Sequence, residues 1–321
     1  RSYSVTGVQT CALPISVILP ALLLSLHGCP KKADVAKESP TSGHLQVYTD
    51  EAHADLVQQE ADAFCRVYEK AHITVVRANT RKSLVFLIND SVRMVVADRL
   101  FNPEESKVVK EANLDIQQLR IAHDALAWLI PAGNSLPGIT MQDLESLLAG
   151  RITRWEDIPA SGRKGPVECI LTDRNSGTYD LLANRFFKLN QPLAIATTAA
   201  TSSETIQLVA DRPNAIGAVA VAALKSSPLG RNLPDSTSGP VKTVGIAATD
   251  STGKSRNFRP YQAYIHTGQY PMHFSLFATF NKKSLLAAGF ASFIASAPGQ
   301  KIVLNYGLVP ATMPIRLVQI N

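Results

Sequence analysis

The chain has 321 residues, of which 45% are hydrophobic and 18% charged, and its formal net charge is +6. This composition is ordinary for a globular protein, and the length allows one or two hydrophobic cores. The positive excess is spread along the sequence without a basic stripe interleaved with aromatic residues, so nucleic-acid binding is not expected. A mild positive balance suits an anionic ligand, although most such charge is solvated surface.

An apolar run near the N-terminus, residues 17–26, ends in the sequence Leu26-His27-Gly28-Cys29. The run has the length of the hydrophobic part of a signal peptide and is too short to span a bilayer. The Gly-Cys pair resembles a bacterial lipobox. We therefore expect Cys29 to receive lipid and the protein to be held at a membrane on the periplasmic side. The alternative is an ordinary signal peptide in which Cys29 is incidental.

The first 43 residues divide into three segments on this interpretation. Residues 1–28 are the signal peptide, and residues 29–43 form a polar tether. Residues 1–16 carry a single charged side chain, Arg1, where a signal peptide normally begins with several basic residues. We interpret residues 1–16 as an artefact that replaces the natural start of the protein.

From residue 45 onward, strand patterns alternate with helix patterns. The run at 92–97 is almost continuously apolar, as expected for a central strand of a parallel sheet. This order predicts an α/β fold in which helices cover both faces of a mostly parallel sheet. The predicted strands cover 45–48, 73–77 and 92–97, and the predicted helices cover 54–70, 83–89 and 103–112.

A second α/β set follows an apolar run at 122–131. Its predicted strands cover 167–171, 215–221, 241–247 and 274–280, its helices cover 139–149, 203–210, 284–296 and 299–306, and 226–240 is a loop.

The last two helices have no strand of their own unless they return to the first set. We therefore expect two lobes, the first discontinuous (44–125 and 272–321) and the second continuous (126–271). A ligand is expected in the cleft between them, outside the carboxyl ends of the strands.

Cysteine and histidine do not form a metal-binding pattern in this sequence. Cys65 and Cys169 lie in segments assigned to different lobes, and we interpret both as buried thiols. We expect neither a metal nor a cofactor.

The most informative motif is Ser176-Gly177-Thr178, between the predicted strand at 167–171 and an apolar-periodic stretch that begins at Leu181. The first N–H groups of a helix have no partner within the helix, and the helix dipole is positive there. Glycine allows a ligand to approach the backbone closely, and the two hydroxyls add neutral donors. The motif therefore predicts an oxyanion seat. The alternative is that Ser176 only caps its own helix.

With these residues considered, the chain resembles the PstS-like phosphate-binding proteins that supply bacterial ABC importers. The resemblance extends from about residue 44 to residue 320. It implies a two-lobed periplasmic-binding-protein fold of type II that closes on its ligand, a monomer without enzymatic activity, and the permease of a phosphate importer as partner. The supporting stretches are 87–93, 121–127, 148–155, 175–178, 214–217, 299–304 and 307–310.

The resemblance also implies which residues bind phosphate. In the second lobe it points to the Ser-Gly-Thr turn and to an arginine four residues before the serine, where this chain has Thr172. Arg174 is the nearest arginine, and it either reaches the ligand or is exposed. The residues implied in this way are Ser176, Gly177, Thr178 and Arg174, and in the first lobe Thr49, Thr80 and Ser83.

Asp98 and Arg99 follow the predicted strand at 92–97 and are also implied as ligand contacts. A buried carboxylate can accept a hydrogen bond from the proton that phosphate keeps near neutral pH, and it repels sulfate, which has no proton to donate. A guanidinium suits an oxyanion because it offers two parallel donors. The alternative is that Asp98 caps the next turn or pairs with Arg99.

Several functions remain open at this level. The leading one is binding of inorganic phosphate. Tyr179 occupies a position where the family often has arginine, so the chain could instead bind another oxyanion or a phosphorylated small molecule. Two different classes are a secreted phosphatase or serine hydrolase that uses Ser176, and a surface scaffold.

Overall fold

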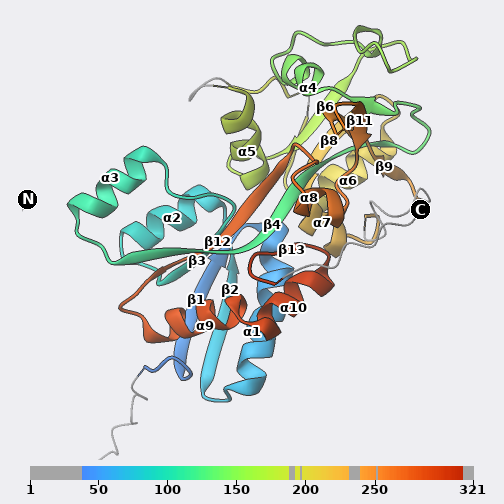
Figure 1. Cartoon of the computed structure of the whole chain (residues 1–321). Coiled ribbons are helices and arrows are strands. Elements are labelled where there is room, and N and C mark those ends of the chain that lie inside the picture. The colour runs from blue at the N-terminus through green and yellow to red at the C-terminus, as the bar shows by residue number, and fades with distance from the viewer. Residues whose placement is uncertain (1–37, 188–191, 196, 231–238, 251, 314–321) are drawn as a thin grey trace, which may run out of the picture. The chain divides into compact units, whose positions relative to one another are not determined.

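The computed structural model describes residues 38–187, 192–195, 197–230, 239–250 and 252–313 (Figure 1). The predictions of a signal peptide and of lipidation at Cys29 lie outside these residues. The described chain begins in contact with the C-terminal part of the protein. Glu38 accepts hydrogen bonds from the Ser284 hydroxyl at 2.7 Å and from the Leu286 N–H at 2.9 Å, at the start of helix α9 (Leu285–Ala295).

The first lobe is built from three parallel strands and the helices that follow them. Strand β1 pairs in parallel with β2 on one side and β3 on the other, as the alternating pattern predicts. All four residues of β3 are buried, in agreement with its apolar sequence. The elements are β1 (Gly43–Thr49), η1 (Glu51–His53), α1 (Ala54–Val67), β2 (Ala71–Arg77), α2 (Thr80–Ile88), β3 (Met94–Ala97) and α3 (Pro103–Glu111).

Two long antiparallel strands, β4 (Ile116–Pro131) and β12 (His273–Asn281), connect the halves of the main sheet. The order of this sheet is β2-β1-β3-β12-β4-β8-β6-β7, and the short strands β9 (Val241–Thr243) and β13 (Val309–Pro310) also pair with β4. Figure 1 shows β4 and β12 running side by side between the two groups of helices. The chain therefore crosses between the lobes along these two strands.

The second lobe carries the other end of the sheet. Strand β6 pairs in parallel with β7 and with β8. A smaller sheet has the order β11-β10-β5. The elements are β5 (Gly138–Ile139), α4 (Met141–Leu148), η2 (Trp155–Asp157), β6 (Glu168–Thr172), α5 (Gly177–Phe186), β7 (Thr197–Ala199), α6 (Ser202–Asp211), β8 (Ala215–Ala220), α7 (Val221–Ser226), β10 (Gly245–Thr249), β11 (Ser255–Phe258) and α8 (Gln262–His266).

The two C-terminal helices return to the first lobe, as expected for helices without a strand of their own. Helices α9 and α10 (Ala297–Tyr306) both pack against α1, and α9 also contacts β1. Phe64 of α1 lies between Phe290 and Phe293 of α9, with ring centroids 5.4 Å from each. This aromatic cluster holds the end of the chain against its beginning.

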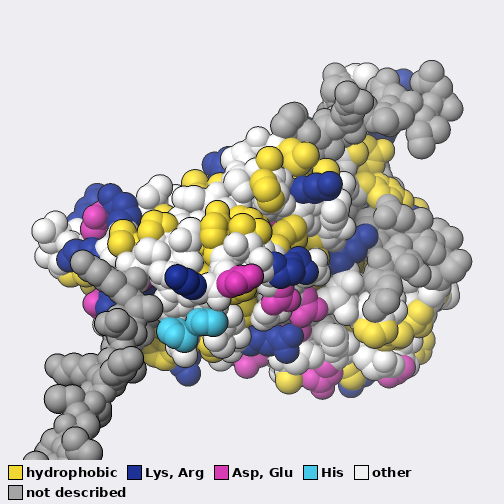
Figure 2. All heavy atoms as spheres, turned by 90° about the horizontal axis from the view of Figure 1, so that it is seen from below, with side chains coloured by type: hydrophobic (Ala, Val, Ile, Leu, Met, Phe, Trp, Pro, Cys, Tyr) yellow, Lys and Arg dark blue, Asp and Glu magenta, His cyan; other side chains and the backbone are white. Residues whose placement is uncertain are grey.

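One large hydrophobic cluster extends through both lobes. Trp128 on β4 and Trp155 in η2 are fully buried within it. Cys169 is buried and Cys65 is half-buried, and both are free thiols. None of the described helices has the length and apolar character needed to cross a membrane. Basic and acidic side chains are interspersed on the face drawn in Figure 2, which agrees with the scattered charge of the sequence.

Several elements differ from the sequence-based predictions. The single strand predicted at 241–247 is two strands, β9 and β10, in different sheets. Strand β4 begins at Ile116, before the apolar run predicted at 122–131. Its first residues are mostly polar and partly exposed, so the apolar pattern of the sequence did not include them. The strand predicted at 215–221 is β8, which ends at Ala220, and Val221 begins α7. The short elements β7, β11 and α8 were not predicted, since three to five residues are too few for a periodic pattern.

Candidate functional site

Helix α5 begins at the Ser-Gly-Thr turn, as the sequence predicts. Ser176 is the N-cap, and its hydroxyl oxygen accepts from the Tyr179 N–H at 3.2 Å. The same oxygen lies 2.7 Å from the Thr172 hydroxyl at the end of β6. Gly177 and Thr178 are buried in the first turn. Ser176 therefore does cap its helix, and this role is compatible with a place in a ligand site because Ser176 also lines a cavity, whereas Gly177 and Thr178 lie buried behind it.

The cavity at this turn has a volume of about 180 Å³ and is bounded by both lobes. Of the described residues that line it, Arg77 is the one cation; its guanidinium lies 3.2 Å from the exposed carboxylate of Asp55. The lining residues are Asp50, Glu51, Arg77, Ala78, Asn79, Thr172, Asp173, Asn175, Ser176 and Ala200.

A carboxylate from the first lobe occupies the N-terminus of α5. The Gly177 N–H donates to Asp50 Oδ2 at 3.2 Å, across 127 positions of sequence. The other oxygen of the same carboxylate, Oδ1, accepts from the Ala52 N–H at 3.0 Å and caps η1. The α5 terminus therefore binds a negatively charged group in this conformation, as the helix dipole favours.

Asp98 reaches the same turn from the end of β3. Its side chain is only 4% exposed, and Oδ1 accepts from the Thr80 hydroxyl at 3.1 Å. A Cβ atom added to Gly177 would lie 2.0 Å from Asp98 Oδ2, so a larger residue here would have to displace the Asp98 carboxylate. Burial, and next the neighbouring Asp50 carboxylate, raise the pKa of Asp98 to about 6.

The three hydroxyl residues implied in the first lobe are all buried, but their partners differ. The Thr80 hydroxyl donates to Asp98, as described above, and the Ser83 hydroxyl donates to the Asn79 carbonyl at 2.9 Å inside α2. Thr49 Oγ1, at the end of β1, is buried and has no hydrogen-bond partner among the described residues. Thr49 is therefore the one of the three whose hydroxyl has no partner among the described residues.

The two predicted arginines do not enter the cavity. The Arg99 guanidinium makes two hydrogen bonds to the Glu105 carboxylate, at 2.7 and 2.9 Å, and Glu105 also caps α3. This pairing, rather than one with Asp98, is what the structure shows. Arg174 is exposed and lines a different cavity, of about 430 Å³, with Asp173, Asn175 and residues 198–200. The structure thus supports exposure of Arg174 over contact with a ligand in the seat.

Two further contacts join the lobes around the turn. The Glu51 carboxylate accepts from the Ser202 N–H at 3.2 Å and from its hydroxyl at 3.1 Å, at the start of α6. Arg81 on α2 lies 3.4 Å from the carboxylate of Asp180 on α5. Burial raises the pKa of Glu51 and also that of Asp180. The cleft is therefore closed by contacts from acidic residues of both lobes.

The acids of this cleft were not predicted from the sequence, namely Asp50, Glu51 and Asp180. They fall in or beside the predicted motifs, but their contacts cross from one lobe to the other. The available signal was local: Asp50 directly follows a buried strand, where a side chain points to the carboxyl edge of the sheet.

A buried pair lies behind the seat, on the same turn as Asp50. His53 Nε2 donates to Asp124 Oδ2 at 3.0 Å, and Asp124 also accepts from the Ala125 N–H at 2.7 Å and the Ala222 N–H at 3.3 Å. Burial works to lower the pKa of His53, but the hydrogen bond and the charge of Asp124 outweigh it, and the pKa is raised.

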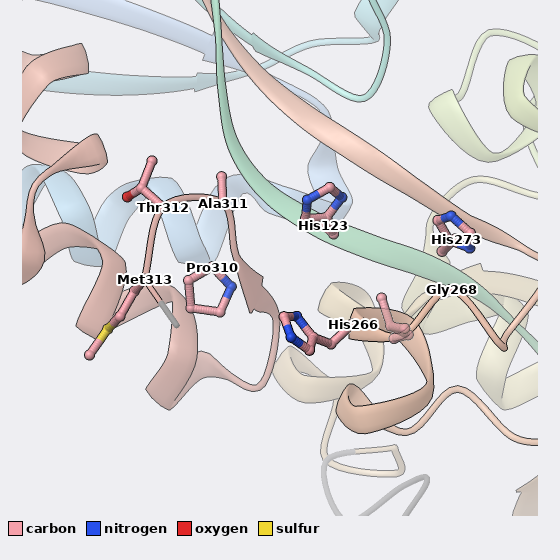
Figure 3. Close-up of a pocket in the computed structure, with 9 residues that line it drawn as sticks. His123, His266, Gly268, His273, Pro310, Ala311, Thr312 and Met313 are labelled. Atoms are coloured by element: carbon pink, nitrogen blue, oxygen red, sulfur yellow. The ribbon is translucent and has the colours of Figure 1, made fainter. Parts of the chain in front are cut away.

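Another cavity lies elsewhere in the molecule, and none of the predicted site residues lines it. It has a volume of about 450 Å³ and lies between β4, α8, β12 and the segment after β13. Figure 3 shows His123, His266 and His273 around it, each from a different element. Among the described residues, no group of three or more histidine, cysteine or acidic side chains is placed to hold a metal ion.

Comparison with known proteins defines the family of the chain. A profile described as a PBP superfamily domain matches residues 34–298, and the chain belongs to this superfamily. Phosphate-binding protein PstS of Pseudomonas aeruginosa is 22% identical over 297 residues, covering 88% of this chain and 87% of the relative. Phosphate-binding protein PstS of Borreliella burgdorferi is 24% identical over 197 residues, covering 59% and 63%. The resemblance to PstS proteins is thereby confirmed.

Solved structures confirm the two-lobed fold. A phosphate-bound chain from Clostridium perfringens superposes with a TM-score of 0.68 at 18% identity, covering 84% of this chain and all of the other. An ABC-type phosphate transport receptor from Vibrio cholerae gives a TM-score of 0.65 at 15% identity, with the same coverage. At these identities the likeness establishes the fold of this chain.

Proposed function

We propose that this protein binds inorganic phosphate in the cleft between its lobes and delivers it to an ABC importer. The observation that carries the proposal is the α5 N-terminus, whose Gly177 N–H is directed at a negatively charged group in the closed cleft. The relatives bearing the name phosphate-binding protein support the choice of phosphate. Binding energy would favour the closed arrangement of the two lobes.

The proposed site has four parts. The second lobe supplies the Gly177 and Thr178 amides and the hydroxyls of Ser176 and Thr178. The first lobe supplies the hydroxyl of Thr49, which has no partner among the described residues, and Asp98 accepts a hydrogen bond from a P–OH group of the ligand. Thr80 positions Asp98. Ser83, Arg99 and Arg174 are left out because the first two have other partners and the third is exposed.

The lobes of this proposal are those expected from the sequence, 44–125 with 272–321 and 126–271. The course of β4 and β12 between the two halves of the sheet supports these boundaries. We also propose that the protein is a monomer without catalytic activity, anchored through lipid on Cys29. Replacement of Cys29 by serine would then release the protein from membranes and abolish labelling by a fatty-acid precursor.

The test of the proposed site is a double variant, Ser176→Ala with Thr178→Val. Removal of both hydroxyls is expected to abolish phosphate binding in calorimetric titration of protein that has first been stripped of phosphate. A melting curve checks that the fold survives the loss of the cap, which costs about 1 kcal/mol. The matched control is Ser91→Ala with Thr153→Val, at two exposed positions. Unchanged affinity in the Ser176 and Thr178 variant would show that the site is elsewhere.

A phosphorylated small molecule is a second candidate ligand. The observation that favours it is the cavity lined by Arg174, which shares Asp173, Asn175 and Ala200 with the seat. A phosphate monoester could place its organic part there. Competition among phosphate, sulfate, arsenate, molybdate and a phosphate monoester separates these ligands.

Catalysis and a scaffold role have cheaper tests. The described partners of the Ser176 hydroxyl are Thr172 and Tyr179, neither of which is a base that could activate a nucleophile. Turnover of a fluorogenic phosphate ester would contradict the absence of catalysis. A melting temperature that no oxyanion changes would favour a scaffold.

A further inference from the structure

The seat of the proposed site is bounded by two carboxylates that are arranged alike. In each, Oδ1 is occupied by a donor of the first lobe: the Ala52 N–H for Asp50 and the Thr80 hydroxyl for Asp98. In each, Oδ2 lies at Gly177, one bonded to its N–H and the other against its Cα. The seat therefore presents two acceptor oxygens to whatever anion enters it.

The surrounding cations do not neutralise these carboxylates. Arg77 pairs with Asp55, Arg81 with Asp180, Arg99 with Glu105 and His53 with Asp124. Asp50 and Asp98 make no ion pair with these cations, and they are the two acids that lie against Gly177. The charged and titratable side chains around Asp50 and its neighbours Asp98 and Asp180 are Glu51, His53, Arg77, Arg81, Arg99, Glu105 and Asp173.

Two unneutralised carboxylates repel an anion unless the anion itself brings protons. Phosphate carries two protons in its singly charged form and one in its doubly charged form, and the two forms interconvert near neutral pH. The doubly charged form would leave one carboxylate facing a bare phosphate oxygen. The singly charged form supplies one P–OH donor for each carboxylate and still offers two oxygens to the donors of the α5 turn.

We propose that the site selects the singly charged, dihydrogen form of phosphate, whose two P–OH groups donate to Oδ2 of Asp50 and Oδ2 of Asp98. This inference rests on the proposed function and adds the protonation state of the ligand. On binding, Asp50 exchanges the Gly177 N–H for a P–OH group, and the Gly177 N–H turns to an unprotonated phosphate oxygen. Each donor and acceptor of the seat is then paired.

The proposal has a consequence that can be counted. At about pH 8 free phosphate is mostly doubly charged, so binding must take up about one proton from the buffer for each phosphate bound. By the same linkage, the affinity falls about tenfold for each pH unit above neutrality. Burial and the Asp50 charge raise the pKa of Asp98, and a more basic carboxylate is a better acceptor for a P–OH group.

The test is calorimetric titration of the phosphate-stripped protein with inorganic phosphate at about pH 8, in buffers that differ in ionisation enthalpy. The wild-type protein is expected to take up about one proton per phosphate. Asp50→Asn is expected to take up almost none, because its amide donates to the bare oxygen of the doubly charged ligand. This variant can keep the cap of η1, since the remaining side-chain oxygen still accepts from the Ala52 N–H. The matched control, Asp62→Asn, changes the same charge on the exposed face of α1 and should behave as wild type.

The outcomes separate this inference from the proposed function. Phosphate binding by the wild-type protein without proton uptake overturns the inference and leaves phosphate binding intact. Proton uptake that persists in Asp50→Asn overturns the assignment to Asp50. A variant that binds more tightly at every pH with an unchanged proton count shows that Asp50 only competes for Gly177, and this also overturns it. Absence of phosphate binding at any pH overturns both proposals.

Discussion

Two buried acidic sites meet at the turn that contains Asp50 and His53, and they are built in opposite ways. Behind the seat, Asp124 is matched by three donors, namely His53 and two backbone N–H groups. At the seat, Asp50 accepts from the Gly177 N–H and Asp98 lies against the same residue, and neither carboxylate makes an ion pair with a described cation. A buried charge is stable when it is fully paired and costly when it is not.

The difference suggests a structural role for the His53–Asp124 pair and a ligand-binding role for the site at Gly177. The His53–Asp124 pair joins η1 to β4 and to the start of α7, so it connects elements of both lobes and is complete without a ligand. The seat is incomplete without a ligand, because Asp50 and Asp98 have no ion-pair partner among the described residues and the Thr49 hydroxyl has no hydrogen-bond partner there. A ligand that pairs these groups would therefore stabilise the closed protein relative to its unliganded form.

Breaking the complete site is expected to have the largest effect. Asp124→Ala leaves His53 and two backbone amides without their acceptor in a fully buried position. We expect a loss of about 3–5 kcal/mol of unfolding free energy, measured by chemical denaturation. Asp62→Ala, on the exposed face of α1, is the control and should change little. A loss below about 1 kcal/mol would show that the pair is not a structural connection.

Changing the incomplete site should stabilise the unliganded protein. The pKa of Asp98 is raised from 3.8 to about 6, so its contribution to stability is full below about pH 4 and is lost as the pH rises through 6. Asp98→Asn cannot ionise and should therefore gain about 2–3 kcal/mol relative to wild type between about pH 4 and 7. Denaturation curves of both proteins across this range, without phosphate, give the difference. A constant difference would mean that Asp98 ionises freely.

A methyl group at the seat should keep the lobes apart. Gly177→Ala places a Cβ 2.0 Å from Asp98 Oδ2 in the closed cleft. Relief of this overlap costs about 1–3 kcal/mol, so we expect phosphate affinity to fall about tenfold to hundredfold in calorimetric titration. Gly133→Ala is the control, because nothing lies within 4 Å of the added atom. Equal affinities in the two variants would place the ligand away from Gly177.

The smallest effects should come from the arginines at the edge of the site. Arg77 lines the seat cavity but is largely exposed, so Arg77→Ala should weaken phosphate binding by about threefold to tenfold. Arg174→Ala should change it by less than about twofold, because Arg174 lines the neighbouring cavity. The two titrations are run side by side at the same ionic strength. The reverse order would restore Arg174 to the site.

Much of the fold could be predicted from the sequence because its signals are local. The apolar run of β3 and the capping residue before α5 each act within a few positions of the chain. Strand β7 could not be found in this way, since its three residues are defined by pairing with β6. The first residues of β4 were missed for the same reason: they pair with β12, which is distant in sequence.

The candidate site was only half predictable. The strand–turn–helix pattern around Gly177 was enough to predict that this residue begins α5. Asp50 was not found, because its contact with Gly177 depends on closure of two lobes. Arg99 was assigned to the ligand, although Glu105, three residues after the helix cap Asn102, was a nearer partner that the capping pattern could have indicated.

The contact of Glu38 with the start of α9 determines how the molecule can be held. Its carboxylate binds Ser284 and Leu286, and a Cβ on Gly289 of the same helix would collide with the Pro40 carbonyl. The chain at residue 38 is thus fastened to the lobe that contains β1. If the protein is attached to a membrane through Cys29 as proposed, the attachment leads to the first lobe, and the second lobe can move relative to it. The proposed importer would then contact one lobe that is tethered and one that moves as the cleft opens and closes.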